Sequence, residues 1–260
     1  AGVFKAGPEL MSAFAAGELD MGYVGEAPAT TAVANGAARV QVLAQVNTEG
    51  SAIVVGADSA LQRVAQLAGR RAAVPGHSTV QDFLLRKALD QAGLSPAQAE
   101  IMVLKPPEMI PALRTGQIDA FVAWEPYPAK ARTSGVGRVL ASSGQVWPGH
   151  PCCVLAADLG FLQRRPQEAR RLVAAHVRAT DFINQHPDEA LAIGVRYTGM
   201  DAETVGLAMA NVNYTYHLSV EGEREYVRLL AEQGYIKVKD ADAFVRRFLN
   251  PGPLRAVLER

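Results

Sequence analysis

Two turns in this chain carry residues that could bind a small anion. The first, Pro75-Gly76-His77-Ser78-Thr79, lies between a short apolar strand pattern and the helix-like run VQDFLLRKAL. A glycine lets the backbone approach a ligand closely, and hydroxyls together with the free N–H groups of a helix start can hold an oxyanion without any arginine. The alternative is that Ser78 merely caps the helix.

The second turn is Trp124-Glu125-Pro126, which follows the apolar strand pattern Ile118–Ala123. An exposed Trp124 could form a cleft wall, or it could fill the core. Glu125, like Glu26 earlier in the chain, could meet an ammonium group of a zwitterion, or it could cap a proline-containing helix. His77 could make a proton-dependent contact or be a solvent-exposed turn residue.

The helix and strand patterns that must position the second of these turns occur twice in the sequence. Glu9–Pro28 reads ELMSAFAAGELDMGYVGEAP, and Glu108–Tyr127 reads EMIPALRTGQIDAFVAWEPY, at an offset of 99 residues. Each copy predicts an amphipathic helix stopped by glycine, a short apolar strand, and a Glu with a Pro opening another helix. Any two βα units share some of these features, but five identities in order at one offset favour duplicated architecture. The simplest function for two such lobes is a clamp whose helix starts lie at strand carboxyl ends.

The composition excludes several other classes of protein. Lys+Arg and Asp+Glu both number 26 in 260 residues, so nothing indicates a nucleic-acid or anionic-membrane surface. No run of 18 apolar residues predicts a membrane helix, and no signal sequence is visible in a chain that begins at Ala1. The adjacent Cys152 and Cys153 are expected to be reduced, buried thiols on a strand, because a disulfide between neighbours is strained and no CxxC spacing is present.

The order of patterns predicts three segments. Residues 1–70 form the first part of lobe 1, and comparison with the second copy predicts that an N-terminal strand–helix unit of this lobe is missing. Residues 71–148 form lobe 2, and 149–260 contribute a return strand and a helical C-terminal region of lobe 1. Helices in that region are expected at about 166–185, 187–197, 201–210, 219–233 and 239–248.

Segments spanning almost the whole chain resemble a known family. They include GPELMSAFAAGELDMGYVGEAPATTAVANGA, VNTEGSAIVV, LAGRRAAVPGHSTVQDFLLRKALDQAGL, ALRTGQIDAFVAWEPYPAKA and LAEQGYIKVKDADAF. In this order they resemble the nitrate/sulfonate/taurine solute-binding proteins of ABC transporters. The resemblance implies an α/β fold of the periplasmic-binding-protein type II class, with two lobes, each a mainly parallel sheet flanked by helices, and a C-terminal helical tail.

The resemblance also implies a function. A small sulfonate, oxyanion or taurine-like zwitterion would bind in a cleft between the lobes, which close by hinge motion. The protein would be periplasmic, or anchored outside the membrane, with a permease and an ATPase as partners. Independently of the resemblance, we expect a monomer without a cofactor or metal. Carried over residue by residue, the expected ligand contacts are Gly25, Glu26, Ala27, Pro28, Asn47, His77, Ser78, Thr79, Trp124 and Glu125.

Two rival functions are weaker. Relatives that bind or make a thiamin-precursor pyrimidine share this fold, but the enzyme branch uses a cysteine-rich motif that Cys152-Cys153 does not reproduce. The five histidines, at 77, 150, 176, 186 and 217, show no HxxxH or HExxH spacing, and the sequence suggests neither a nucleophile nor a metal set. A sensor domain of a transcription regulator would have a similar architecture, yet no helix-turn-helix or basic patch is evident. We therefore expect a binding protein and not an enzyme.

Overall fold

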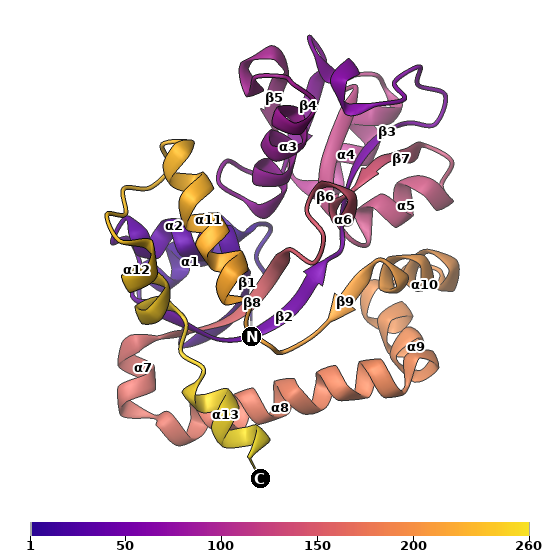
Figure 1. Cartoon of the computed structure of the whole chain (residues 1–260). Coiled ribbons are helices and arrows are strands. Elements are labelled where there is room, and N and C mark those ends of the chain that lie inside the picture. The colour runs from indigo at the N-terminus through magenta and orange to yellow at the C-terminus, as the bar shows by residue number, and fades with distance from the viewer. Residues whose placement is uncertain (1, 260) are drawn as a thin grey trace. The chain divides into compact units, whose positions relative to one another are not determined.

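The computed structural model describes residues 2–259 (Figure 1). The chain forms two compact units. Unit 1 comprises Ala1–Thr48, Pro151–Pro187 and Tyr214–Arg260, and unit 2 comprises Glu49–His150 and Asp188–Asn213. Each unit is built around its own β-sheet.

The duplicated segment is confirmed as one helix–strand–helix motif in each unit. Helix α1 (Gly7–Ala15) and strand β1 (Met21–Gly25) of unit 1 correspond to α4 (Pro106–Arg114) and β6 (Ala120–Trp124) of unit 2, with all four bounds offset by 99 residues. The motif continues into α2 (Glu26–Ala34) and α5 (Tyr127–Thr133). Gly17 and Gly116 end the first helices with φ of 74° and 69°, a left-handed conformation that glycine adopts without steric penalty.

The sheet that contains β1 has the order β1-β8-β2-β9, where β2 is Val40–Glu49, β8 is Pro151–Asp158 and β9, Val212–Tyr214, spans the point in the sequence where unit 2 gives way to unit 1. Strand β8 pairs antiparallel with both β1 and β2. The expectation of a mainly parallel sheet is therefore wrong for this unit. The return strand β8 inserts between β1 and β2 and runs against both of them, so the two strands of like direction never pair.

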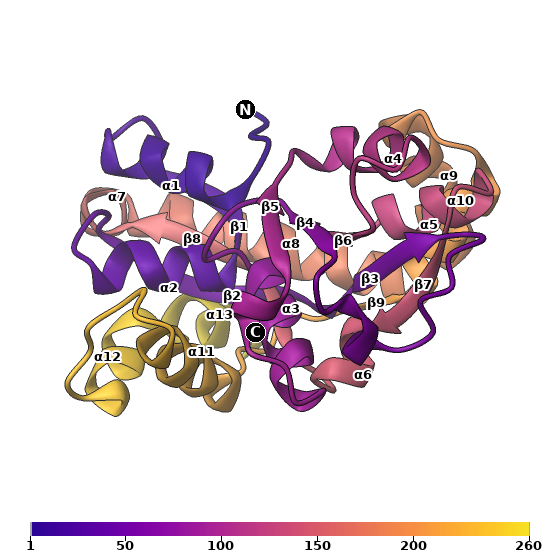
Figure 2. The same ribbon diagram turned by 90° about the horizontal axis from the view of Figure 1, so that it is seen from above.

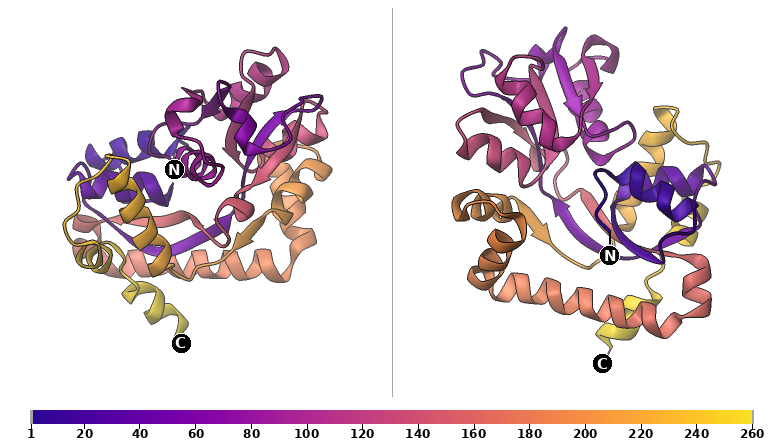
Figure 3. Two further views of the ribbon diagram at one scale, coloured as in Figure 1. Left: turned by 45° about the horizontal axis from the view of Figure 1, so that its top comes forward. Right: turned by 180° about the vertical axis from the view of Figure 1, so that it is seen from behind.

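Helices cover both faces of this sheet. Side chains of β2 and β8 pack against α8 (Pro166–Gln185) and α13 (Gly252–Leu258), where Leu43, Leu155, Val173 and Leu254 share one core. Figure 3 shows α13 lying across α8. Helix α2 packs on β1 and β8, and α11 (Val220–Glu232) and α12 (Ala241–Phe248) lie against α2 (Figure 2). Helix α7 (Leu159–Arg164) connects β8 to α8.

The sheet of unit 2 has the order β5-β4-β6-β3-β7 and is mixed. Strand β4 (Arg71–Val74) runs parallel to β5 (Glu100–Val103) and β6, whereas β3 (Ser51–Gly56) runs antiparallel to β6 and β7 (Gly137–Ser142). One core joins this sheet to α4 and α5 through apolar residues that include Val54, Met109, Leu113 and Phe121. The remaining elements are η1 (Val64–Leu67), α3 (Val80–Gln91), η2 (Pro96–Gln98), α6 (Ser143–Val146), α9 (Pro187–Thr198) and α10 (Ala202–Ala210).

The division of the chain differs from the expected one at two places. Unit 2 begins at Glu49 and not at 71, because β3 hydrogen-bonds to strands of unit 2 on both of its edges. Residues 188–213 also belong to unit 2. Helix α10 packs on α5, where the hydroxyls of Thr133 and Thr204 lie 2.6 Å apart and Lys130 pairs with Asp201 at 3.1 Å.

Two further expectations concern the cysteines and the membrane. Cys152 and Cys153 are free thiols on β8, as predicted, but only Cys152 is buried; Cys153 is half-buried, so the expectation of two buried thiols is wrong for Cys153. Within residues 2–259, none of the helices combines the length and the apolar character that crossing a membrane requires.

Candidate functional site

The turn after β4 is organised by Thr79, the N-cap residue of α3. Its Oγ1 accepts a hydrogen bond from the Asp82 amide at 3.2 Å and donates one to the Gly76 carbonyl at 2.7 Å. Thr79, not Ser78, is therefore the cap, and the single hydrogen of its hydroxyl is already donated inside the turn. A hydrogen bond from the Thr79 side chain to an anion would have to displace the bond to Gly76.

Ser78 differs from Thr79 in its backbone conformation and in its hydrogen bonds. Its φ is 55°, in the left-handed region that side-chain-bearing residues seldom occupy, and its amide donates to Asp82 Oδ2 at 3.0 Å. The hydroxyl of Ser78 makes no hydrogen bond within residues 2–259. Asp82 is fully buried and is balanced by Arg86, whose Nε lies 2.9 Å from Oδ1. Neighbouring His77 is exposed.

The start of α3 offers further donors. The amides of Val80 and Gln81 belong to the first helical turn, where no preceding carbonyl can accept from them, and no other acceptor reaches them in the described part of the chain. Backbone amides at a helix start carry partial positive charge. Together with the Ser78 hydroxyl, they make this turn able to bind an anion.

The turn after β6 lies at the same edge of the sheet. Strands β4 and β6 are parallel neighbours, with Ala73 opposite Phe121, so their carboxyl ends lie together. Trp124 is half-buried and meets Tyr127 edge to face at 6.2 Å. The structure thus brings together the two turns of unit 2 that the sequence singled out.

Glu125 acts as a cap and not as an open ligand group. Its Oε2 accepts from the Ala129 amide at 3.0 Å in the first turn of α5, and its Oε1 accepts from Asn211 Nδ2 at 2.7 Å. Burial raises the pKa of Glu125, while these two hydrogen bonds oppose that shift. Both carboxylate oxygens are engaged within unit 2, which favours the capping interpretation.

Three buried polar residues near these turns were missed by the sequence reasoning. Ser51 lies opposite Trp124 in the β3–β6 register; its Oγ accepts from Gln81 Nε2 at 3.0 Å, and its amide donates to Ser143 Oγ at 3.1 Å. This network ties the start of α3 to the end of β6. Ser51 falls inside VNTEGSAIVV and Gln81 inside the PGHSTVQD run, but only the strand pairing shows that they meet.

In unit 1 the corresponding turn is Gly25-Glu26-Ala27-Pro28, which begins α2. Glu26, Ala27 and Pro28 are buried. The Glu26 carboxylate points inward, where its Oε2 accepts from Gln45 Nε2 at 3.0 Å. The expectation that Glu26 could meet an ammonium of the ligand gains no support, because this side chain is 1% exposed and its neighbours are protein groups.

Glu26 shares its buried site with Glu223 of α11. Burial raises the pKa of Glu26 to about 7, against hydrogen bonds from Gln45 and Glu223 that lower it. Burial and the adjacent Glu26 charge raise the pKa of Glu223 well above its ordinary value. No cationic side chain within residues 2–259 pairs with either carboxyl. Two such carboxyls are accommodated by retaining protons.

Asn47 lies on β2 opposite Cys153 and is half-buried. A hydrogen bond joins it to Cys152. The two sulfur atoms lie 3.9 Å apart, and the hydrogen bond with Cys153, together with burial, raises the pKa of Cys152 well above its ordinary value. This thiol is therefore protonated and unreactive at neutral pH.

Within the described range, no group of three or more His, Cys, Asp or Glu side chains could hold a metal ion.

With this geometry in view, comparison with known proteins identifies the family. The sequence profile of the NMT1-like family matches residues 2–195. The chain belongs to the NMT1-like family. The resemblance found in the sequence is thereby confirmed, and the match includes every expected ligand-contact residue.

Two individual relatives share less than a third of their residues with this chain over the aligned regions. The taurine-binding periplasmic protein of Escherichia coli K12 is 27% identical over 221 residues, covering 82% of this chain and 68% of that protein. A protein of Brucella abortus, named only as a binding protein, is 29% identical over 202 residues and covers 76% of this chain. This chain spans 61% of the length of that relative.

Solved structures show that the fold is shared. The alkanesulfonate-binding protein SsuA from Xanthomonas axonopodis pv. citri, bound to MOPS, matches with a TM-score of 0.82 at 22% identity, over 93% of this chain and 85% of that one. The periplasmic nitrate-binding protein NrtA from Synechocystis PCC 6803 matches with a TM-score of 0.85 at 16% identity, over 98% and 79%. The desulfurization enzyme DszB also matches, with a TM-score of 0.71 at 16% identity, over 92% and 85%. The expected periplasmic-binding-protein fold is confirmed.

Proposed function

We propose that this protein is the extracytoplasmic solute-binding component of an ABC importer and that it binds a small sulfonate, a related oxyanion or a taurine-like zwitterion. The observation that carries the proposal is the start of α3, where the amides of Val80 and Gln81 and the hydroxyl of Ser78 have no protein acceptor within residues 2–259. The names of the taurine-binding and alkanesulfonate-binding relatives support the same ligand class.

The chemistry of the turn fits a tetrahedral anion. A sulfonate offers three acceptor oxygens, and two amides and one hydroxyl can each donate to one of them. The donors are preorganised, because the Thr79 cap and the Ser78–Asp82 hydrogen bond fix the turn before any ligand arrives. Arg86 offsets the charge of Asp82, which would otherwise repel the anion.

Trp124 supplies a surface for the apolar part of the ligand. It ends β6, the parallel neighbour of β4, and remains half-exposed beside Tyr127. An alkyl or aryl group attached to the sulfonate would pack against its ring. Nitrate lacks such a group and would gain nothing from Trp124, so we expect organic sulfonates to bind more tightly.

Binding without turnover is the expected activity. The relatives named above are binding proteins, although DszB shows that this fold also carries an enzyme. A thiolate at Cys152 is not favoured, because the hydrogen bond with Cys153 and burial raise the pKa of Cys152; the same hydrogen bond lowers the pKa of Cys153. No observation within residues 2–259 favours the pyrimidine alternative. A membrane permease and an ATPase are the proposed partners, and a location outside the cytoplasmic membrane follows from the periplasmic relatives.

A thermal-shift and calorimetry panel tests the proposal, with taurine, alkyl and aryl sulfonates, nitrate and a thiamin-type pyrimidine as ligands. A ligand that binds only the folded state raises Tm in proportion to the logarithm of its concentration. Ser78→Ala should weaken sulfonate binding roughly tenfold, the value of one hydrogen bond to a charged group. Ser95→Ala, which removes the exposed cap of η2, is the matched control and should bind as the wild type does.

Two results would contradict the proposal. One is the absence of any sulfonate or oxyanion binding, and the other is release of sulfite or another product from a bound sulfonate, which would indicate an enzyme.

A further inference from the structure

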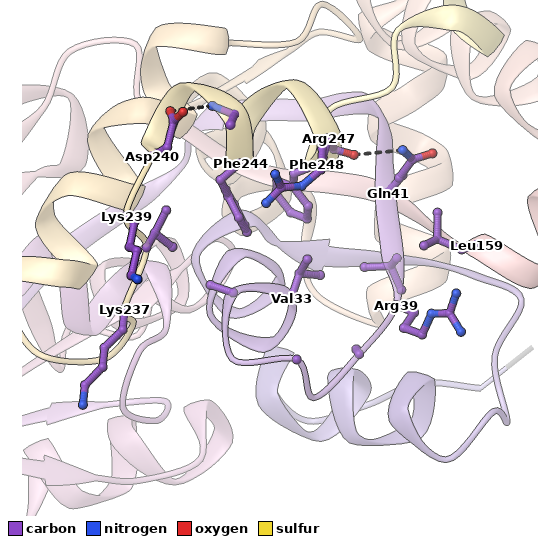
Figure 4. A pocket seen from close by; sticks show the side chains of 16 residues that line it. Val33, Arg39, Gln41, Leu159, Lys237, Lys239, Asp240, Phe244, Arg247 and Phe248 are labelled. Atoms are coloured by element: carbon purple, nitrogen blue, oxygen red, sulfur yellow. Dashed lines mark hydrogen bonds between the residues drawn. The ribbon is translucent and has the colours of Figure 1, made fainter.

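We propose that a basic groove in unit 1 is a docking site for an acidic segment of a partner protein. The basic groove lies between the end of α2 and helix α12 and has a volume of about 680 Å³ (Figure 4). Its lining comes from the end of α2, residues 38–41, Leu159 of α7, the loop 237–240 and α12.

The groove concentrates positive charge. Four cations line it, namely Arg39, Lys237, Lys239 and Arg247, against the single acid Asp240, so its formal charge is +3 (four minus one) in a chain whose net charge is zero. The Asp240 carboxylate is already engaged, because it accepts from the Ala243 amide at 2.9 Å as the cap of α12. It therefore does little to neutralise its neighbours.

The four cations are also unpaired, in contrast with Arg228 on α11, the helix that packs against α12. Arg39, Lys237, Lys239 and Arg247 form no ion pair within residues 2–259. On α11, by contrast, Arg228 pairs with Glu225 at 2.9 Å and with Glu232 at 2.8 Å. Local acids thus neutralise Arg228, while the cations that line the groove are left for an external anion.

The floor of the groove is apolar. Phe244 and Phe248 of α12 are buried beneath it, with their ring centroids 5.4 Å apart, and half-buried Val33, Leu159 and Val238 also line it. An apolar side chain of the partner would meet the exposed parts of Val33, Leu159 and Val238, while its carboxylates would meet the cations at the rim. A groove with this pairing of properties fits an amphipathic acidic segment.

The spread of the cations indicates an extended occupant. Figure 4 shows Lys237 and Lys239 at one end of the view, Arg39 at the other and Arg247 between them. One small anion could reach only part of this set, whereas a segment with several carboxylates could reach all four. A membrane surface would favour cations on a protruding face, and here they surround a hollow. All residues that line the groove belong to unit 1, whereas Ser78, Val80, Gln81 and Trp124 of the proposed solute site belong to unit 2, so the two sites share no residue.

The test uses the whole chain and a short fluorescein-labelled peptide that is rich in glutamate and contains two leucines. We expect fluorescence anisotropy to show binding that weakens as salt is added. The variant R39S/K237S/K239S/R247S should bind about tenfold more weakly or worse, from the loss of four exposed ion pairs. The matched control R171S/R178S/R196S/R255S removes the same charge from exposed positions elsewhere and should bind within about twofold of the wild type.

Three outcomes would overturn the inference. The first is equal loss of peptide binding in the two variants, and the second is no binding by the wild type while circular dichroism shows it folded. The third is binding to phosphatidylglycerol vesicles without binding to the peptide, which would assign the groove to a membrane surface.

Discussion

The hydroxyl of Thr30 lies 2.9 Å from both carboxylate oxygens of Glu223, a residue 193 positions away along the chain. The same hydroxyl lies 3.0 Å from the Glu26 carbonyl, and the Glu26 side chain shares the buried site with Glu223. This cluster holds the start of α11 against the start of α2. The cluster is stable only if the carboxyls of Glu26 and Glu223 retain protons, because no positively charged side chain of the described residues lies near them. The other groups around them include Gln45, Tyr226, Cys152 and Cys153.

We predict that stability falls as the pH rises from 5 to 7. Burial raises the pKa of Glu26 from 4.5 to about 7, and that of Glu223 well above 4.5. The folded chain therefore retains protons that the unfolded chain has released, and their stabilising effect is complete below about pH 4.5 and is lost as the pH rises through the folded values. For Glu26 alone the loss is on the order of 3 kcal/mol.

Urea denaturation at a series of pH values measures this dependence. Glu223→Gln should reduce the slope of unfolding free energy against pH, and the double variant E26Q/E223Q should remove the contribution of this site. Glu203→Gln, on an exposed position of unit 2, is the control and should follow the wild type. If the plots of unfolding free energy against pH were parallel for all variants, Glu26 and Glu223 would not be protonated in the folded state.

We predict that Thr79→Ala destabilises the chain by about 1 kcal/mol, because it removes the hydroxyl that caps α3. Thr79→Ser keeps the oxygen and should recover most of the loss. Chemical denaturation followed by circular dichroism gives the values. If Ala and Ser variants were equally destabilised, the methyl group and not the cap would be the important feature.

Tyr226 offers a test of a buried hydrogen bond. Its hydroxyl donates to the Pro151 carbonyl at 2.6 Å, and the ring is fully buried. Tyr226→Phe should cost roughly 1–3 kcal/mol, because the carbonyl at the start of β8 would lose a donor that water cannot replace. Tyr197→Phe, at a residue that is 89% exposed, should be neutral. If calorimetry gave the same loss of unfolding free energy for Tyr226→Phe and Tyr197→Phe, the stabilising hydrogen bond assigned to Tyr226 would be contradicted.

The two copies of the repeat allow an internal comparison. Asp119 accepts from the amide and the guanidinium of Arg71, at 2.9 Å and 3.1 Å, whereas the side chain of its counterpart Asp20 makes no hydrogen bond within residues 2–259. Asp119→Ala should therefore cost about 1–2 kcal/mol and Asp20→Ala less than about 0.5 kcal/mol. Denaturation midpoints that shifted equally would show that the Arg71 contact contributes nothing.

Local structure was largely predictable from the sequence. The helix, glycine stop and strand of each repeat appear at the expected offset, and the helices expected near 166–185, 187–197 and 201–210 are α8, α9 and α10 to within a residue or so. Helix periodicity, caps and glycine stops act over a few residues, so a single stretch of sequence contains all the information they need. The places of the two turns, before α3 and after β6, were predictable for the same reason; anion binding at Ser78 and a ligand contact at Trp124 stay predictions.

Tertiary structure alone decided the rest. The insertion of β8 between β1 and β2, the place of β3 in the second sheet, the inward turn of Glu26 toward Glu223 and the contact of Ser51 with Gln81 all join residues far apart in the chain. The basic groove likewise gathers Arg39 and Arg247 from distant segments. Sequence determined which elements form, because their signals are local. The packing of sheets and helices determined which polar groups are buried together and which cations are left exposed, because those energies depend on neighbours in space.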